Sequence, residues 1–473
     1  MRNGPELPPT GAPQTPIGPS SIEAPTLREA IRVWARIGVL SFGGPAGQIA
    51  LMHEELVERR AWIDSERFLH ALNYCMLLPG PEAQQLATYI GFLIHGTPGG
   101  LAAGLLFVLP GALLMGVLSA LYAVFHMAPA VAALFFGLKA AVFAVVLEAV
   151  LRIGKRALRS RVLVAVAGLA FVALFFFAIP FPFVVLAAGA FGFIGSRVAP
   201  WTFPPSSVRG PETTQDSLVS RMAAAGELKH TTPSARRALY TLLVFGAAWA
   251  LPLACLRLAL GPASVYVREG VFFSQAAVLT FGGAYAVLAY VAQAAVDEFH
   301  WLAPGEMLDG LGLAETTPGP LILVLQFVGF LGAYRDPGTL PPLLAGFFGS
   351  FVTLWATFAP CFLMIFIGAP YIELLRGHRS INAALASITA AVVGVILNLG
   401  VWFGLHVLFR SVTEIQLGPL HMLAPSLASI DLGASTLAAI ALLCLMRFKL
   451  GLPKTLALST TLGFAMKLLL GFS

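Results

Sequence analysis

Long apolar runs, interrupted by glycine and proline, dominate the pattern of hydrophobic and polar positions along this chain. Four runs reach the roughly 20 residues that a helix needs to cross a bilayer core. They occupy residues 99–125, 132–151, 341–369 and 381–409. Two longer runs, 162–196 and 432–472, are interrupted once and are typical of helical hairpins. The pattern therefore predicts several transmembrane helices.

Two further considerations favour helices over strands. Backbone polar groups within lipid must be hydrogen-bonded inside the protein, and long runs rich in Ala, Leu and Gly do not alternate as the strands of an outer-membrane barrel do. The composition agrees, because 58% hydrophobic and 11% charged residues, with a mean hydropathy of +0.84, leave too little polar surface for a soluble globule. We therefore expect an all-α polytopic membrane protein.

The chain contains one series of motifs twice, at a constant offset of 239 residues. Phe42-Gly43-Gly44 recurs as Phe281-Gly282-Gly283, and Pro79-Gly80-Pro81 recurs as Pro318-Gly319-Pro320. A gap-free internal repeat in so apolar a sequence is typical of a transporter whose two related halves face one site.

Each copy begins with apolar stretches that are too short and too broken for ordinary spans. SFGGPAG interrupts the run 29–57 and LLPGPEA interrupts the run 66–97, while TFGGAYA and TTPGPLI do the same in the second copy. Proline cannot donate to the helix ladder and glycine adopts dihedrals that other residues avoid, so each motif should end one half-helix and begin another. We expect re-entrant hairpins whose half-helix N-termini, with about half a positive charge each, suit an anion.

Lys and Arg residues follow membrane topology rather than a nucleic-acid-binding pattern, although the net charge is +6. Five of them lie within residues 152–161, and more follow in the segment 197–238. Both segments should be cytoplasmic, so the apolar run 239–260 carries the chain across the membrane once more before the second copy begins. The two copies are then inverted relative to each other.

Corresponding loops of the two copies differ in charge as this inversion requires. The loop 125–130 has no Lys or Arg and corresponds to the basic loop 374–380, while the basic segment 447–454 corresponds to an apolar hairpin tip in the first copy. Arg335 is a mild exception, because the scheme places it outside, but the neighbouring Asp336 can offset its charge.

These observations divide the chain into five segments. Residues 1–27 form a proline-rich tail that lacks the apolar side chains of a core and should be disordered. The remainder comprises the first repeat (28–196), a basic cytoplasmic linker (197–238), a connecting transmembrane helix (239–260) and the second, inverted repeat (261–473). The N-terminus should be cytoplasmic, without a signal peptide, and the C-terminus periplasmic or extracellular.

Several classes of chemistry are not indicated. The four widely spaced cysteines form no CxxC or Cys/His cluster, so we expect no metal site and no disulfide framework. The sequence also lacks phosphate-binding glycine loops, a GxSxG elbow and an HExxH helix. We expect no cofactor, no enzyme and no ATP-driven transport, and we keep a membrane-embedded enzyme acting on an anionic lipid or phosphate as the alternative from another class.

The stretch SFGGPAGQIALMHEELVERRAWIDSERFLHALNYCMLLPGPEAQQLATYIG, followed by GLKAAVFAVVLEAVLRIGKRALR, resembles the chromate ion transporter family in its long form with two homologous halves. TFGGAYAVL and TPGPL extend the resemblance into the second half. It implies export of chromate, a tetrahedral dianion, across the bacterial plasma membrane, and hence chromate resistance. Sulfate or another oxyanion is the alternative substrate. The partners would be the oxyanion and the lipid bilayer, without nucleic acid, and we expect a homodimer.

Polar residues in apolar surroundings are candidates for the site, because each is expensive in lipid. Lys139 can neutralise part of a dianion or pair with Glu148 or Glu82, and either Lys139 or Glu82 can couple transport to the proton gradient. Glu82 can also simply complement the dipole of the helix that it begins. Gln85 can donate amide hydrogens without adding charge.

The second copy is less polar at the equivalent positions, since Leu321 replaces Glu82 and Val324 replaces Gln85. We therefore place the more polar side of the site on the first copy. Thr316 and Thr317 can supply hydroxyl donors or cap the following helix. The full set of expected site residues is Phe42, Gly43, Gly44, Pro79, Gly80, Pro81, Glu82, Gln85, Lys139, Gly282, Gly283, Thr316, Thr317 and Gly319.

The inverted topology predicts the outcome of cysteine labelling in a variant without the native cysteines. Lys155→Cys and Gly377→Cys should react with a membrane-impermeant maleimide only after the cells are permeabilised, because basic loops stay in the cytoplasm. Met127→Cys should react in intact cells. Labelling that places residues 155 and 377 on opposite faces of the membrane would rule out this topology.

Overall fold

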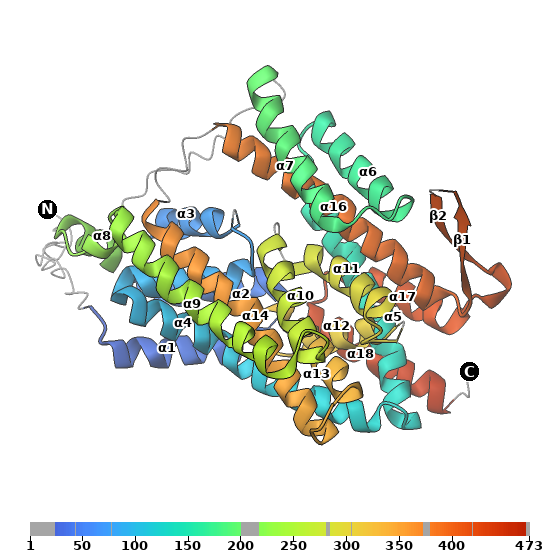
Figure 1. Ribbon diagram of the computed structural model, residues 1–473. Helices are drawn as coiled ribbons and strands as arrows, with labels where there is room; N and C mark the ends of the chain where they lie inside the picture. The colour runs from blue at the N-terminus through green and yellow to red at the C-terminus, as the bar shows by residue number, and fades with distance from the viewer. Residues whose placement is uncertain are drawn as a thin grey trace, which may run out of the picture.

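A computed structural model describes residues 24–42, 44–76, 78–199, 217–280, 284–303, 305–371, 379–418 and 420–469. These residues are almost wholly helical (Figure 1), which confirms the all-α polytopic class. One small element was not predicted, a hairpin of the antiparallel strands β1 (Val412–Leu417) and β2 (Leu420–Pro425). Most of the proline-rich tail and the predicted site residues Gly43, Gly282 and Gly283 lie outside the described residues.

The helices of the first half begin and end close to the predicted breaks. They are α1 (Leu27–Leu40), α2 (Gly44–His53), the π-helical η1 (Glu54–Arg59), α3 (Ser65–Cys75), α4 (Glu82–Phe125), α5 (Pro129–Ala157), α6 (Arg161–Phe175) and α7 (Phe181–Val198). Within α4, His95 and Gly96 leave helical geometry, so a half-helix and a transmembrane span are joined end to end. Gly96 has a φ of 62°, which glycine adopts readily.

The second half repeats this order of elements. It comprises α10 (Val265–Leu279), α11 (Ala284–Gln293), the π-helical η4 (Ala294–Glu298), α12 (Glu306–Thr316), η5 (Leu321–Leu323), α13 (Val324–Arg335), α14 (Pro342–Gly368), η6 (Ala369–Tyr371), α16 (Arg379–Leu408), the β hairpin, η7 (Leu427–Ser429), α17 (Leu432–Met446), α18 (Leu452–Phe464) and η8 (Ala465–Leu469). Between the halves lie α8 (Leu218–Ala224), η3 (Lys229–Thr231) and α9 (Ala235–Leu260).

Unusual backbone geometry also recurs at equivalent positions. The non-glycine residues with positive φ in the described part of the chain are Ala61, Ala178, His300 and Lys449. His300 follows Ala61 at the offset of the sequence repeat, and Lys449 and Ala178 both lie in the turn of the last helical hairpin of their half. Residues other than glycine rarely adopt positive φ. Its recurrence at equivalent positions therefore shows that the two halves share local backbone conformation as well as sequence.

The long helices α5 and α16 each pack against helices of the opposite half. Helix α5 packs against α17 and α18 of the second half, while α16 packs against α6 and α7 of the first (Figure 1). Within each half, α1 packs against α4 and its counterpart α10 packs against α14. The contacts of α5 with α17 and α18 are thus equivalent to the contacts of α16 with α6 and α7, as expected if a pseudo-two-fold axis relates the two halves. Neither half therefore forms a separate domain.

The second part of the linker is anchored to the first half. The backbone amides of Leu218 and Val219 donate to the carbonyls of Ala61 (3.0 Å) and Trp62 (3.0 Å), and the hydroxyl of Ser220 donates to Asp64 Oδ2 (2.9 Å). Asp64 also caps α3 by accepting from the Arg67 amide. These hydrogen bonds thus hold the start of α8 against the turn between η1 and α3.

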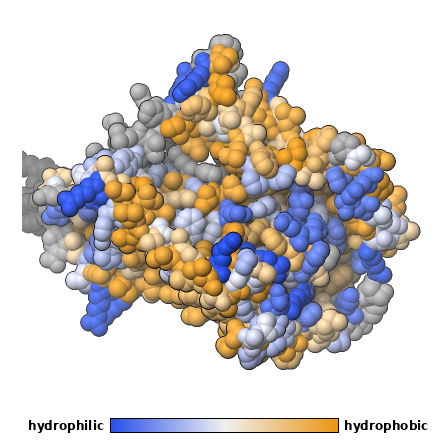
Figure 2. Space-filling view, viewed as in Figure 1, coloured by the Kyte–Doolittle hydropathy of each residue, from blue (hydrophilic) through white to orange (hydrophobic). Residues whose placement is uncertain are grey.

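Six helices in the described ranges are long and apolar enough to cross a membrane. They are α4, α5, α7, α9, α14 with the turn that follows it, and α16. Helix α9 corresponds to the predicted connecting helix, and its exposed side chains include Leu239, Leu243, Leu251 and Leu258. Hydrophobic side chains cover much of the face in view (Figure 2), as expected for a surface in contact with lipid tails.

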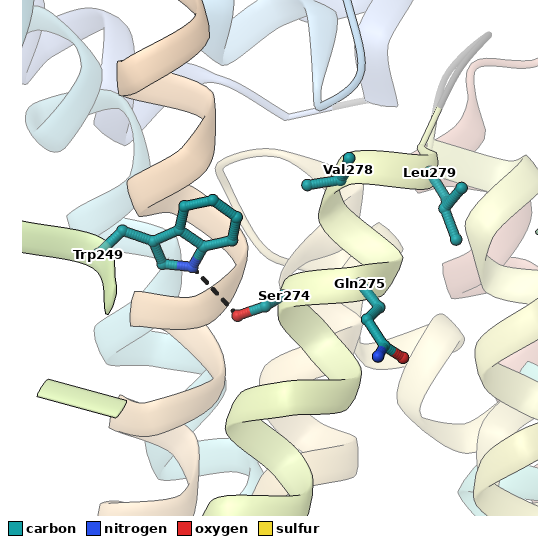
Figure 3. Close-up of a pocket in the computed structure, with 5 residues that line it drawn as sticks. All are labelled: Trp249, Ser274, Gln275, Val278 and Leu279. Atoms are coloured by element: carbon teal, nitrogen blue, oxygen red, sulfur yellow. Dashed lines mark hydrogen bonds between the residues drawn. The ribbon is translucent and has the colours of Figure 1, made fainter. Parts of the chain in front are cut away.

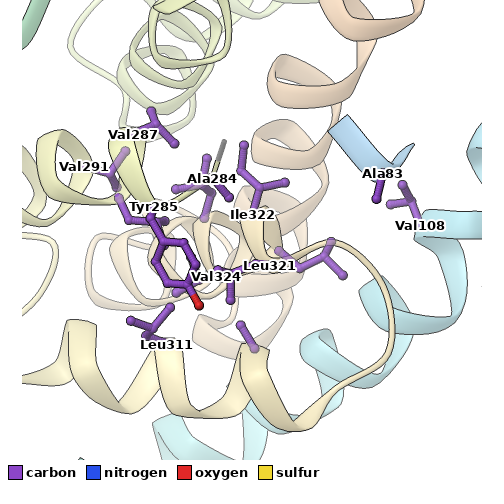
Figure 4. Packing of buried hydrophobic residues seen from close by; sticks show 14 of the residues in the cluster. Ala83, Val108, Ala284, Tyr285, Val287, Val291, Leu311, Leu321, Ile322 and Val324 are labelled. Atoms are coloured by element: carbon purple, nitrogen blue, oxygen red, sulfur yellow. The ribbon is translucent and has the colours of Figure 1, made fainter. Parts of the chain in front are cut away.

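Buried apolar side chains fill the region where the breaks of the second half meet α4. Figure 4 shows Leu321 and Ile322 of the TTPGPLI break, and Val324 at the start of α13, packed near Leu311 of α12 and the ring of Tyr285 of α11. The Tyr285 hydroxyl is directed toward α12, where Glu315 accepts its hydrogen bond. This packing holds a short irregular segment rigidly between helices.

Replacing Gly80 should destabilise the fold more than replacing a helical glycine. Gly80 has a φ of 128°, and a Cβ there would lie 2.9 Å from Cys361 Sγ. Gly80→Ala should therefore cost about 1–3 kcal/mol and lower the thermal midpoint of the purified protein. Gly168→Ala, in α6 with no atom within 4 Å of the added Cβ, is the matched control and should leave the midpoint unchanged. Equal midpoints for the two variants would contradict a constrained break.

Candidate functional site

The breaks of opposite halves are joined in pairs by backbone hydrogen bonds. The Gly80 amide donates to the carbonyl of Thr280 (2.8 Å), and the Gly319 amide donates to the carbonyl (3.0 Å) and hydroxyl (2.9 Å) of Ser41. Gly80 and Gly319 are equivalent in the repeat, and so are Ser41 and Thr280. The structure thus brings one break of each half against a break of the other half in two equivalent pairs. However, the amides of Gly80 and Gly319 are not free for an anion, contrary to expectation.

Two buried glutamine side chains also hold the breaks. Gln85 donates to the carbonyl of Pro79 (2.7 Å), and Gln48 donates to the carbonyls of Gly319 (2.5 Å) and Ser41 (3.3 Å). In this structure the Gln85 amide thus bonds to a carbonyl of its own break, and its role in substrate binding stays a prediction. Gln48 is not among the predicted site residues, although a glutamine just after FGGPAG is a polar residue in an apolar run.

The two threonines before the second Pro-Gly-Pro do not have the expected roles. Thr316 donates to the carbonyl of Leu313 (2.8 Å), and Thr317 donates to the carbonyl of Ala314 (3.0 Å). Both hydroxyls therefore satisfy carbonyls at the end of α12 rather than cap the next helix or face an anion. The physical reason is that the last carbonyls of a helix lack partners within it.

Lys139 lies in an ion pair that the sequence did not predict. Its Nζ is 3.2 Å from Asp309 Oδ2, which also accepts a hydrogen bond from the Tyr122 hydroxyl (2.8 Å). Lys139 therefore pairs with neither Glu148 nor Glu82, and the pair joins α5 of the first half to α12 of the second. Asp309 was missed, although an acid within the apolar stretch EMLDGLGLA is unusual enough to be noticed.

A polar cavity of about 290 Å³ lies at the N-terminus of α2, between the two halves. The first half lines it with Gly44 and Pro45, which begin α2, and with Glu148 and Arg152 of α5. The second half contributes Tyr285, Glu315, Leu445, Lys449, Leu450 and Leu452. The cavity thus combines a helix N-terminus with two cationic side chains, which are the elements that bind anions.

The two acids of this cavity have different partners. Glu148 lies 3.6 Å from Arg152, one turn away on the same helix. Glu315 is buried and its Oε1 accepts a hydrogen bond from the Tyr285 hydroxyl (2.6 Å). Its Oε2 has no hydrogen-bond partner among the described residues.

Comparison with known proteins identifies the family. A family model described as Chromate transporter matches residues 28–193 and 267–464, which is most of the chain. The chain belongs to the chromate transporter family. Similar proteins include "Chromate transport protein" of Pseudomonas aeruginosa, 33% identical over 368 residues, which cover 76% of this chain and 77% of that protein. "Chromate transport protein" of Cupriavidus metallidurans is 28% identical over 371 residues, covering 78% of this chain and 81% of that protein. No solved structure matches the chain.

Membership of the chromate transporter family confirms the predicted resemblance and the prediction of a transporter rather than an enzyme. The family model matches the chain in two separate regions, one in each half. Among the predicted site residues with described positions, Gly44 lines the polar cavity. Phe42 is exposed, and Pro79, Gly80 and Pro81 are buried at the break before Glu82, which begins α4.

A second recess of this chromate transporter family member is unsuited to an anion. It has about 300 Å³ and lies between α9 and α10 (Figure 3), where Trp249 Nε1 donates to Ser274 Oγ (3.1 Å). Gln275, Val278 and Leu279 complete its lining, so it has no charged side chain. The polar cavity at α2 is therefore the better candidate.

Arg335 is neutralised differently from the prediction. Its guanidinium forms two hydrogen bonds with Glu306 (2.8 and 2.7 Å) and one with the carbonyl of Trp301 (2.7 Å). Asp336 instead pairs with Arg268 (3.3 Å). The bidentate geometry neutralises the Arg335 charge within the protein, which removes the need for Asp336 to offset it.

A double-mutant cycle should reveal coupling between Lys139 and Asp309. Lys139→Met or Asp309→Asn alone should lower the stability of the purified protein by about 1–3 kcal/mol, because each leaves a partly buried charge without its partner. The double variant should recover part of that loss, as measured by thermal midpoints. Lys155→Met, on the exposed end of α5, controls for loss of a lysine. Strictly additive losses would show that the pair is not coupled.

Proposed function

We propose that this protein exports chromate from the bacterial cytoplasm through the polar cavity, and so provides chromate resistance. The observation that carries the proposal is the convergence of Arg152, Lys449 and the N-terminus of α2 on one cavity between the halves. The names of the relatives from Pseudomonas aeruginosa and Cupriavidus metallidurans support chromate as the substrate. Sulfate, with nearly the same tetrahedron of oxygens, is the competing substrate.

The cationic groups of the cavity can attract a dianion without a metal or cofactor. Arg152 and Lys449 supply two full positive charges, and the first turn of α2 supplies about half a charge more through its amides. Arginine presents planar paired donors that match neighbouring oxygens of a tetrahedral oxyanion, while lysine acts as a point charge. These groups come from both halves, so relative movement of the halves would change the site.

Contacts between distant segments support the inverted arrangement of the halves. Arg152 and Lys449, which belong to two segments expected in the cytoplasm, line the same cavity. On the opposite side, the amide of His421 in β2 donates to the carbonyl of Phe176 in the turn after α6 (2.8 Å). Both of these segments are expected outside. In this arrangement the cavity opens toward the cytoplasm, from which an exported anion enters.

The ion pair of Lys139 then acts as an outer barrier. Lys139 lies 13 residues before Arg152 on α5, which corresponds to about 20 Å along the helix toward the outside. With Asp309 and Tyr122 it joins α4, α5 and α12 at a point beyond the cavity. Alternating access requires this contact to open when the cytoplasmic side closes, as the two halves exchange conformations.

The membrane potential favours export of a dianion. Moving one charge across 100 mV is worth about 2.3 kcal/mol, so a dianion leaving a negative interior gains about 4.6 kcal/mol. Export therefore requires no ATP site. A proton that travels with the anion would reduce the free energy that the membrane potential supplies to export.

Flux measurements with matched variants test the proposal. Proteoliposomes loaded with radiolabelled chromate should release it when the parent protein is present. Arg152→Gln and Lys449→Gln should each weaken apparent chromate affinity by about tenfold or more, because a charge-assisted contact is lost.

Lys155→Gln is the control, because this exposed lysine lies one turn from Arg152 and outside the cavity. It should behave as the parent does. An excess of unlabelled sulfate shows whether the two oxyanions compete. Absence of chromate flux through the parent protein would refute the proposed function.

A further inference from the structure

Glu315 places a carboxylate directly against the start of α2. Its Oε2 lies 3.9 Å from the point that a Cβ on Gly44 would occupy, and Gly44 is the first residue of α2. The side chain is only 3% exposed. Oε1 is held by Tyr285, whereas Oε2 has no hydrogen-bond partner in the described part of the chain. One oxygen of the carboxylate is therefore fixed, and the other is buried without a partner beside the first residue of α2, in a residue that lines the cavity.

The groups around Glu315 compensate its negative charge only in part. Arg152 and Glu148 face it from α5 with opposite charges and lie 3.6 Å apart, so each weakens the effect of the other. Tyr285 faces it from α11, and Lys449 lines the same cavity from the turn between α17 and α18. Glu315 itself belongs to the last turn of α12, where the helix carbonyls disfavour a negative charge.

The charges of the cavity sum to zero when both acids are ionised. Arg152 and Lys449 contribute two positive charges, and Glu148 and Glu315 contribute two negative charges. A bound dianion would leave the cavity with a surplus of two negative charges in surroundings of low dielectric constant, which is costly. One proton on a cavity acid halves this surplus.

We infer that Glu315 takes up one proton when the oxyanion enters the cavity. Ionised Glu315 occupies the positive start of α2 and repels a second anion there. Protonated Glu315 removes that repulsion and turns an acceptor oxygen into an O–H donor that can bond to the anion. The proton comes from cytoplasmic water and binds to a carboxylate oxygen, so no other reactant is needed. This inference rests on the proposed function and assigns the cavity a proton that travels with the substrate.

Another buried acid fits this role less well. Glu269 is also fully buried, and neither of its carboxylate oxygens has a hydrogen-bond partner among the described residues. However, its oxygens lie against Gly332 of α13 and Gly349 of α14, and it lines neither of the two cavities. It therefore faces neither the polar cavity nor the recess between α9 and α10.

Chromate binding to the purified full-length protein, measured at a series of pH values, tests the inference. Affinity for the parent protein should fall by up to about tenfold per pH unit above the titration of Glu315. Glu315→Gln keeps an oxygen that can accept the Tyr285 hydrogen bond but cannot ionise. Its affinity for chromate should therefore not show this fall with rising pH. Chromate itself is protonated to the same extent in both experiments. The difference between the pH profiles of affinity of the parent and Glu315→Gln therefore comes from the ionisation of Glu315.

Proton uptake gives a second readout that does not depend on transport. In weakly buffered solution at a pH at which Glu315 is ionised, chromate binding should take up about one proton more with the parent protein than with Glu315→Gln. Glu414→Gln, which removes an exposed acid from β1, is the matched control and should take up as many protons as the parent. Equal proton uptake by the parent and Glu315→Gln would overturn the inference.

Tyr285→Phe keeps the inference testable if Glu315→Gln does not fold. Loss of the 2.6 Å hydrogen bond disfavours the ionised carboxylate, so proton release and the fall in affinity should both move to higher pH. An unchanged profile in Tyr285→Phe would also overturn the inference. If the parent neither binds nor transports chromate, the proposed function fails first. If it does both but its profile equals that of Glu315→Gln, only the role of Glu315 fails.

Discussion

The structure depends on two backbone hydrogen bonds that join the breaks of one half to those of the other. A helix that stops inside a bilayer exposes amides and carbonyls that lipid cannot satisfy. Here the Gly80 amide finds the carbonyl of Thr280, and the Gly319 amide finds Ser41. Each half supplies the partners that the other lacks, so the breaks are stable only in the assembled pair. The same constraint explains why α5 and α16 pack mainly against helices of the opposite half.

A symmetric scaffold carries an asymmetric site. Position 285 holds a tyrosine whereas its counterpart is Ala46, and position 315 holds a glutamate whereas its counterpart is Met76. Lys449 likewise corresponds to Ala178, a residue with the same positive φ. Polar groups of the cavity thus occupy only one of two equivalent positions, while Ala178 and Lys449 share a backbone conformation. The cavity consequently receives polar groups from both halves, whereas the sequence comparison had placed the polar side on the first.

The sequence predicts elements better than partners, for a physical reason. Breaks and spans follow from local properties, since glycine, proline and apolar length act on neighbouring residues. The side chains of Gln85 and Thr316 bond to carbonyls only six and three residues away, whereas the ion pair of Lys139 with Asp309 depends on which distant segments meet in space. The polar side chains are evident in the sequence, but a polar residue within lipid indicates only that it has some hydrogen-bond or ionic partner. It does not distinguish a substrate from a carbonyl of the same helix.

Proton uptake by Glu315 would change the energetics of export rather than only its pH dependence. Chromate that leaves with one proton carries one net negative charge, so the gain from a potential of 100 mV falls from about 4.6 to about 2.3 kcal/mol. An exterior more acidic by one pH unit removes about 1.4 kcal/mol more. In return, a single net charge is far easier than two to hold between low-dielectric helices, because the desolvation cost rises steeply with charge. A carrier that pairs its dianion with a proton therefore gives up driving force and lowers the barrier at the closed state, where Lys139 and Asp309 must separate.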